Sequence, residues 1–275
     1  MLSKEAERKG TKDECESENF DRKKIPYRQA IGSLQYLANS TQPDILFAVN
    51  TLSRKQETFN AQDWSAVKRI FRYLKGTANL GITYRGVKDE IECYPDASFG
   101  ISDSEERSTS GYAILLFGDL IAWRTKLQTQ VALSSAEAEY VAMSLACKEV
   151  ESISEILKHL IQLKKIPLLF EDNMAAIKLA KTEESPTLRH LVNVCYHYVR
   201  QQVRDKKIEL RWISTKEQLG DFFTKALPRP DFCKFRELLM SNFVCSQSHG
   251  IKRKISGESN EMKRKRIENM KKRIS

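Results

Sequence analysis

The order of strand-like and helix-like segments after Gly81 most constrains how this chain of 275 residues can fold. Alternating or β-branched apolar runs predict strands, and longer runs with apolar residues three or four positions apart predict helices. The predicted strands lie at 82–84, 91–94, 111–117, 120–123, 167–170 and 208–213. The predicted helices are a long one from about Ser134, two at 174–181 and 190–205, and a last one from near Gln218. This order predicts an α/β fold with a mixed central sheet and flanking helices.

Residues 26–78 precede this region and show three helical patterns instead. The first runs from Tyr27 to Asn39, the second begins at Pro43, and the third runs from about Ala61 to Lys75. Proline suits the first turn of a helix because its missing N–H would have no partner there. We therefore expect a small helical segment at 26–78, followed by one α/β domain at 79–241.

The two ends of the chain differ in composition from the middle. Residues 1–25 are charged, mixed in sign and poor in apolar residues, which predicts disorder. Residues 242–275 have no apolar periodicity, and ten Lys or Arg against three Glu in 251–275 give a net +7 of the chain's +10. We expect a basic disordered tail that contacts phosphates, acts as a nuclear-import patch or has no role. The body carries only about +3, so composition alone does not predict that it binds nucleic acid.

Cysteine and histidine spacing argues against a zinc site. None of the six cysteines forms a C-x-x-C pair, and the four histidines show no H-x-x-x-H spacing. The sequence shows no secretory signal and no apolar run of membrane-spanning length. We expect a cytoplasmic or nuclear protein with reduced thiols, neither secreted nor bound to a membrane.

Four acidic residues fall where strands are predicted to end or helices to begin. They are Asp96, Glu139, Asp172 and Asp221. In open α/β sheets, functional sites collect at the carboxyl ends of strands. Magnesium prefers carboxylate and water oxygens, and two such ions can activate a water and stabilise a leaving oxygen. Each acid taken alone is more simply explained as a solvated surface charge or a helix cap, because most acids are exposed.

Two of these acids have an acidic neighbour. Glu137 and Glu139 lie about 200° apart around a helix axis, so both cannot face one site. Glu171 and Asp172 are adjacent at a strand end, where successive side chains point to opposite faces.

Five motifs in one order resemble the ribonuclease H domain of copia-type retrotransposon Pol polyproteins, in their C-terminal part. The motifs are YPDA at 94–97, RSTSGY at 107–112, VALSSAEAEY at 131–140, EDNMAAI at 171–177 and QLGDFFTKALP at 218–228. Residues 26–78 resemble the segment that connects reverse transcriptase to ribonuclease H in the same polyproteins. The resemblance covers about residues 26–240. The polymerase motif Y-x-D-D is absent, so polymerisation is not expected.

The resemblance implies a ribonuclease H-like fold and metal-dependent cleavage of the RNA strand of RNA–DNA hybrids. Carried over by position, Asp96, Glu139, Asp172 and Asp221 are the catalytic and metal-binding carboxylates. The family assigns the second glutamate of E-A-E, which selects Glu139. The implied cofactor is Mg²⁺ or Mn²⁺, with two ions, and the implied partners are an RNA–DNA hybrid and a reverse transcriptase subunit.

Three further residues border the implied site: Ser134, Ser135 and Asn173. They either contact the sugars or phosphates of the hybrid or, for the two serines, simply cap the following helix. The sequence leaves both alternatives open.

The chain also departs from the family pattern. Leu191 stands at the position of a usual histidine, Cys195 at that of a usual arginine, and Gly220 at that of a usual alanine. Three functions therefore remain. The first is an active hydrolase, the second a catalytically decayed or domesticated nucleic-acid-binding remnant, and the third a scaffold that pairs with a reverse transcriptase through residues 26–78.

Overall fold

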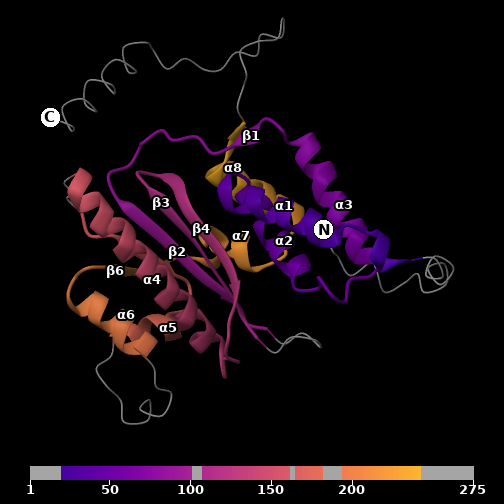
Figure 1. The fold of residues 1–275 in the computed structure, drawn as a ribbon. Helices are drawn as coiled ribbons and strands as arrows, with labels where there is room; N and C mark the ends of the chain where they lie inside the picture. Colours follow the sequence, from indigo (N-terminus) through magenta and orange to yellow (C-terminus); the bar gives the residue numbers. More distant parts are fainter. Residues whose placement is uncertain (1–19, 101–106, 162–164, 182–193, 243–275) are drawn as a thin grey trace, which may run out of the picture.

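The computed structural model describes residues 20–100, 107–161, 165–181 and 194–242 (Figure 1). Its helices are α1 Tyr27–Ser40, α2 Leu46–Ser53, α3 Ala61–Gly76, α4 Ser135–Leu160, α5 Met174–Lys181, α6 Val194–Arg204, α7 Asp221–Thr224 and α8 Arg229–Leu239. Its strands are β1 Leu80–Gly81, β2 Ile91–Ser98, β3 Thr109–Leu116, β4 Asp119–Leu127, β5 Leu168–Glu171, β6 Glu209–Trp212 and β7 Ser241–Asn242. Of the segments predicted to be disordered, 1–19 and 243–275 lie outside the described residues. The prediction was wrong for 20–25, where Arg22–Lys24 form a short 3-10 helix and Phe20 and Ile25 pack against the core.

The centre of the molecule is a five-stranded sheet in the order β4-β3-β2-β5-β6. Strands β2, β3 and β4 pair antiparallel, whereas β5 pairs parallel with both β2 and β6. The central strand β2 is buried along its whole length except at Ser98, because helices cover both of its faces. The mixed sheet with flanking helices is therefore confirmed.

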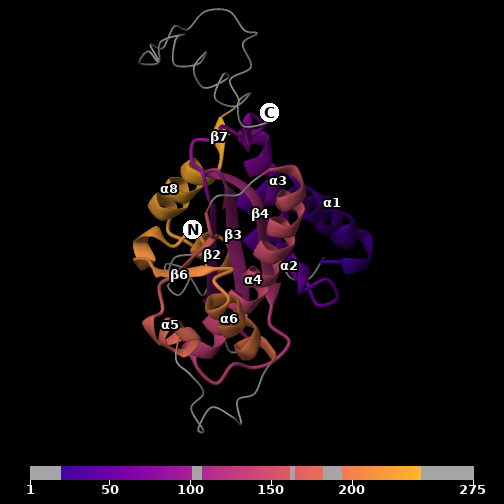
Figure 2. The same cartoon turned by 90° about the vertical axis from the view of Figure 1, so that its left-hand side faces the viewer.

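The two faces of the sheet carry different helices (Figures 1 and 2). Helices α4, α5 and α6 cover one face, where Cys93 and Ile114 pack against Tyr140 and Met143 of α4. Helices α1, α2, α3, α7 and α8 contribute to the core on the other face, which includes Leu115. Neighbouring residues of one strand thus serve opposite cores, as the alternation of side chains along a strand requires.

The N-terminal helices pack directly on the sheet. The indole Nε1 of Trp123 on β4 donates to the carbonyl of Ala38 on α1 at 2.8 Å, and Asn50 on α2 donates to the carbonyl of Thr125 at 3.3 Å. Residues from α1, α2 and α3 share one hydrophobic core with β3 and α7. The three predicted helices are present, and together they form part of the layer that covers this face.

Two predicted elements were wrong. No strand forms at 82–84; β1, Leu80–Gly81, instead pairs with β7. The chain turns soon afterwards at Gly86, which has φ +63°, and Asp119 accepts the backbone N–H groups of Arg85 and Gly86 there. The single helix predicted from near Gln218 is instead two helices: α7 begins at Asp221 and ends at Thr224, and α8 begins at Arg229, after Pro228.

Among the described residues, no helix is both long and apolar enough to cross a bilayer.

Candidate metal centre

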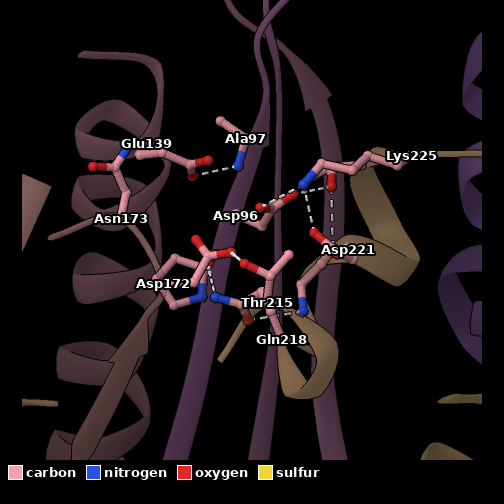
Figure 3. Close-up of polar contacts among 12 residues, drawn as sticks. Asp96, Ala97, Glu139, Asp172, Asn173, Thr215, Gln218, Asp221 and Lys225 are labelled. Carbon is pink, nitrogen blue, oxygen red and sulfur yellow. Dashed lines mark hydrogen bonds and ion pairs between the residues drawn. The ribbon is translucent and has the colours of Figure 1, made fainter. Parts of the chain in front are cut away.

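Three of the four predicted carboxylates come together at one edge of the sheet (Figure 3). Asp96 lies on β2, Asp172 directly follows β5, and Glu139 reaches over from α4. One ligand atom from each lies within 4.8 Å of the others. Strands β2 and β5 are parallel neighbours, so their carboxyl ends bring Asp96 and Asp172 to the same edge. Asp96 is fully buried and Glu139 is buried, while Asp172 is partly exposed.

The start of α4 decides which glutamate enters the cluster. The Oε2 atom of Glu139 accepts the backbone N–H of Ala97 at 2.6 Å. Glu137 points elsewhere and accepts the backbone N–H of Leu133 at 2.7 Å. The geometry therefore places Glu139 beside Asp96 and leaves Glu137 in the first turn of the helix.

The cluster is electrostatically costly without a cation. Burial, followed by the charges of Asp96, Glu171 and Asp172, raises the pKa of Glu139 to about 11. Burial also raises the pKa of Glu171, to which the charges of Asp172 and Asp96 add. Like charges held together in a site of low polarity need either protons or a metal ion to offset their repulsion.

The fourth carboxylate reaches the cluster through a lysine. The Nζ of Lys225 lies 2.6 Å from Oδ1 of Asp221 and 3.2 Å from Oδ1 of Asp96. The hydroxyl of Thr224 also donates to Asp96. Asp221 is buried at the start of α7, and burial and the charge of Asp96 raise its pKa to about 7. Asp221 is therefore a neighbour of the three-carboxylate group and not one of its members.

The other predicted residues border the site in structural roles. Ser134 caps α4 by accepting the N–H of Glu137 at 3.2 Å, and Ser135 is an exposed residue of the first turn. Asn173 caps α5 by accepting two backbone N–H groups, from Ala175 at 2.9 Å and Ala176 at 3.2 Å. Of the departures from the family pattern, Leu191 lies outside the described residues, and Cys195 is described only as part of the backbone of α6.

Glu171 is a fifth carboxylate that strand alternation predicted to point away from the site. Its side chain is fully buried, its Oε1 accepts the N–H of Asn173 at 3.0 Å, and its Oε2 has no hydrogen-bond partner among the described residues. Strand alternation does not separate Glu171 from Asp172, because β5 ends at Glu171 and Asp172 already belongs to the following loop. The two adjacent acids at the strand end, Glu171 and Asp172, were the sequence feature that could have indicated a further carboxylate at the site.

The loop before α7 packs against the strand ends that carry the site. Gln218 is fully buried, and its Nε2 donates to the carbonyls of Pro95 at 3.0 Å and Phe170 at 3.2 Å. A Cβ atom on Gly220 would lie 2.6 Å from the Cβ of Asp96, so the backbone of the loop approaches the carboxylate closely. Thr215 donates to Asp172 at 2.7 Å. Gln218 therefore fixes the backbone next to Asp96 and Glu171, and Thr215 orients the carboxylate of Asp172 directly.

The donor set fits a hard divalent cation. Asp96, Glu139 and Asp172 supply carboxylate oxygens only, which are the ligands that Mg²⁺ and Mn²⁺ take up. The unpartnered, fully buried Oε2 of Glu171 is a further oxygen in the same region whose negative charge a cation would offset.

Solved structures of ribonucleases H and of a viral reverse transcriptase are similar to parts of this chain. The match to LC11-RNase H1, solved in complex with RNA/DNA hybrid, covers 49% of this chain and 94% of the LC11-RNase H1 chain, at 13% identity and a TM-score of 0.36. The match to the N-terminal RNase H domain of a Mycobacterium tuberculosis protein covers 55% of this chain and 98% of that domain's chain, at 9% identity and a TM-score of 0.37. The match to a prototype foamy virus protease-reverse transcriptase covers 85% of this chain and 27% of the viral chain, at 10% identity and a TM-score of 0.37.

Sequence relatives show the family. The chain is 36% identical over 216 residues to the retrovirus-related Pol polyprotein from transposon TNT 1-94 of Nicotiana tabacum, covering 78% of this chain and 16% of that protein. It is 36% identical over 211 residues to the polyprotein from transposon RE2 of Arabidopsis thaliana, covering 76% of this chain and 14% of that protein. A shorter relative, secreted RxLR effector protein 161 of Plasmopara viticola, is 40% identical over 128 residues, 46% of this chain and 90% of that protein.

No protein-family model matches the chain. The chain spans about one sixth of the length of the first two relatives, 16% and 14%. The chain belongs to the retrovirus-related Pol polyproteins of copia-type transposons, of which it corresponds to a part.

Proposed function

We propose that this chain is a metal-dependent ribonuclease that hydrolyses the RNA strand of RNA–DNA hybrids. The observation that carries the proposal is the convergence of Asp96, Glu139 and Asp172, from two parallel strands and a helix, to within 4.8 Å. Three carboxylates at that spacing repel one another, so their arrangement costs stability unless a cation binds between them. Their position at the strand ends, in a relative of Pol polyproteins, supports a role in phosphoryl chemistry.

In this proposal the cofactor is Mg²⁺ or Mn²⁺, held by Asp96, Glu139 and Asp172. When bound, such an ion lowers the pKa of a water and offsets the negative charge that develops on the phosphate. The chain's own contribution is to orient the ligands. The N–H of Ala97 fixes Glu139, Thr215 fixes Asp172, and Thr224 fixes Asp96.

The proposed substrate is an RNA–DNA hybrid whose phosphodiester approaches the exposed side of the cluster. Asp172 is the partly exposed member of the cluster and marks that side. A phosphate cannot approach several ionised carboxylates without a cation between them, because all the charges have one sign. The proposal therefore requires metal for cleavage. A reverse transcriptase subunit is proposed as a partner through residues 26–78.

Cleavage assays on three matched duplexes test this function. The purified protein is incubated with RNA–DNA, RNA–RNA and DNA–DNA duplexes of one sequence, with Mg²⁺, with Mn²⁺ and with chelator. We expect cutting of RNA in the RNA–DNA duplex alone, and only with metal. A folded protein that binds the hybrid and cuts nothing would contradict the proposal and support the nucleic-acid-binding remnant.

A further inference from the structure

The ammonium group of Lys225 lies between two buried carboxylates. Its ammonium bridges Asp96, whose side chain is 0% exposed, and Asp221, whose side chain is 9% exposed, while the lysine side chain itself is 36% exposed (Figure 3). The lysine follows Asp221 by four residues and lies just after the end of α7, so the chain itself tethers the ammonium beside both acids.

Asp96 is shared between two groups of charges. On one side it joins Glu139 and Asp172, and on the other it joins Lys225 and Asp221. Two-ion phosphoryl-transfer sites hold their ions about 3.5–4 Å apart. In such a layout Asp96 would serve both ions, and the second would lie between Asp96 and Asp221. That is where the structure has the Lys225 ammonium.

We infer that in the substrate-free protein the ammonium of Lys225 takes the place of the second ion, so that the protein binds one divalent cation, at Asp96, Glu139 and Asp172. This inference rests on the proposed function. It changes the expected number of ions in the free protein from two to one. It also makes Lys225 a positioning residue, because it holds Asp96 and Asp221 in place without touching the substrate.

The geometry of the charges supports the inference. The ammonium lies 3.2 Å from Oδ1 of Asp96 and 2.6 Å from Oδ1 of Asp221, so its positive charge offsets both buried carboxylates. A tethered ammonium also competes at a high effective concentration against an ion from solution, and the two like charges cannot share the position.

Counting bound Mn²⁺ by electron paramagnetic resonance tests the inference without measuring activity. The variants are Lys225→Met, which removes the charge, and Lys225→Arg, which keeps it. Lys88→Met is the matched control, because Lys88 pairs with the buried Glu92 of strand β2 at 2.6 Å, with a side chain that is 45% exposed. The melting temperature of each protein in chelator establishes that it is folded.

We expect one bound Mn²⁺ in the unaltered protein, in Lys225→Arg and in Lys88→Met, and two in Lys225→Met. Two ions in the unaltered protein would overturn the inference, as would one ion in folded Lys225→Met. Either result would leave the proposed function standing, because the three-carboxylate site would still bind metal. Absence of bound Mn²⁺ from every protein would instead overturn the proposed function together with the inference.

Discussion

The carboxylate of Glu139 accepts the backbone N–H of Ala97 at 2.6 Å, which fixes helix α4 to strand β2 next to Asp96. This contact brings the two carboxylates together before any ion binds. The assembled site is therefore a source of instability in the metal-free protein, since burial and neighbouring charges raise the pKa of Glu139 from 4.5 to about 11. Metal binding should relieve that instability and can be detected by its effect on folding.

Glu139→Gln should make the metal-free protein more stable at alkaline pH. A carboxyl group with a raised pKa in the folded state keeps a proton that the unfolded state releases above pH 4.5, so stability falls as pH rises towards 11. The glutamine removes that dependence. We expect an increase in the free energy of unfolding on the order of 1–3 kcal/mol at about pH 8, measured by thermal melting in chelator over a series of pH values.

Glu137→Gln is the matched control for this prediction, because Glu137 lies two residues away on the same helix and outside the cluster. Its melting temperature should follow that of the unaltered protein at each pH. Added Mg²⁺ should stabilise the control and the unaltered protein, but not Glu139→Gln. Equal pH dependence in all three proteins would show that the carboxyl group of Glu139 does not have the raised pKa.

Gly111→Ala should destabilise the protein while Gly32→Ala should not. A Cβ on Gly111 in β3 would lie 2.7 Å from Cγ2 of Thr224 and 2.9 Å from Cβ of Phe223, whereas nothing lies within 4 Å of one on Gly32. Overpacking of this kind costs about 1–3 kcal/mol. Alanine in place of glycine within helix α1 should add about 0.5–1 kcal/mol. Denaturant unfolding of both variants measures the difference, and equal stabilities would contradict the close approach of α7 to β3.

Deletion of 251–275 should weaken hybrid binding in a salt-dependent way. This segment lies outside the described residues, and the prediction rests on its ten basic and three acidic side chains. The affinity becomes less dependent on salt when fewer basic side chains neutralise phosphates. We expect a large decrease in affinity at low salt, a small one at high salt, and an unchanged melting temperature. A parallel fall in affinity and melting temperature would mean that the segment is part of the folded structure.

The sheet and most helices could be predicted from the sequence, because their apolar periodicities match the cores on both faces of β2. The prediction of a strand at 82–84 was wrong for a reason that cannot be read from the local sequence. A strand exists only where a partner supplies hydrogen bonds, and here β7, Ser241–Asn242, pairs with Leu80–Gly81. That pairing joins two segments far apart in the chain.

Three of the four predicted carboxylates lie together in the structure. Asp96 and Asp172 could be placed near each other because each was expected at the end of a strand, whereas Glu139 was chosen over Glu137 on the resemblance to the family. Lys225 and Glu171 could not be placed in the site from the sequence. The sequence shows that Lys225 is four residues after Asp221, but not that Asp96 lies on its other side. Glu171 was assigned to the opposite face because the alternation of side chains was extended past the strand end to Asp172, whereas β5 ends at Glu171 and Asp172 lies in the following loop.

Hybrid cleavage by Asp172→Asn beside Glu137→Gln tests the central claim most directly. Both variants remove one negative charge from residues near the site, but only Asp172 belongs to the three-carboxylate group. We predict that Asp172→Asn loses metal-dependent RNA cleavage and remains folded, whereas Glu137→Gln cleaves like the unaltered protein. Undiminished cleavage by Asp172→Asn, or equal loss of cleavage in both variants, would contradict the assignment of the metal centre.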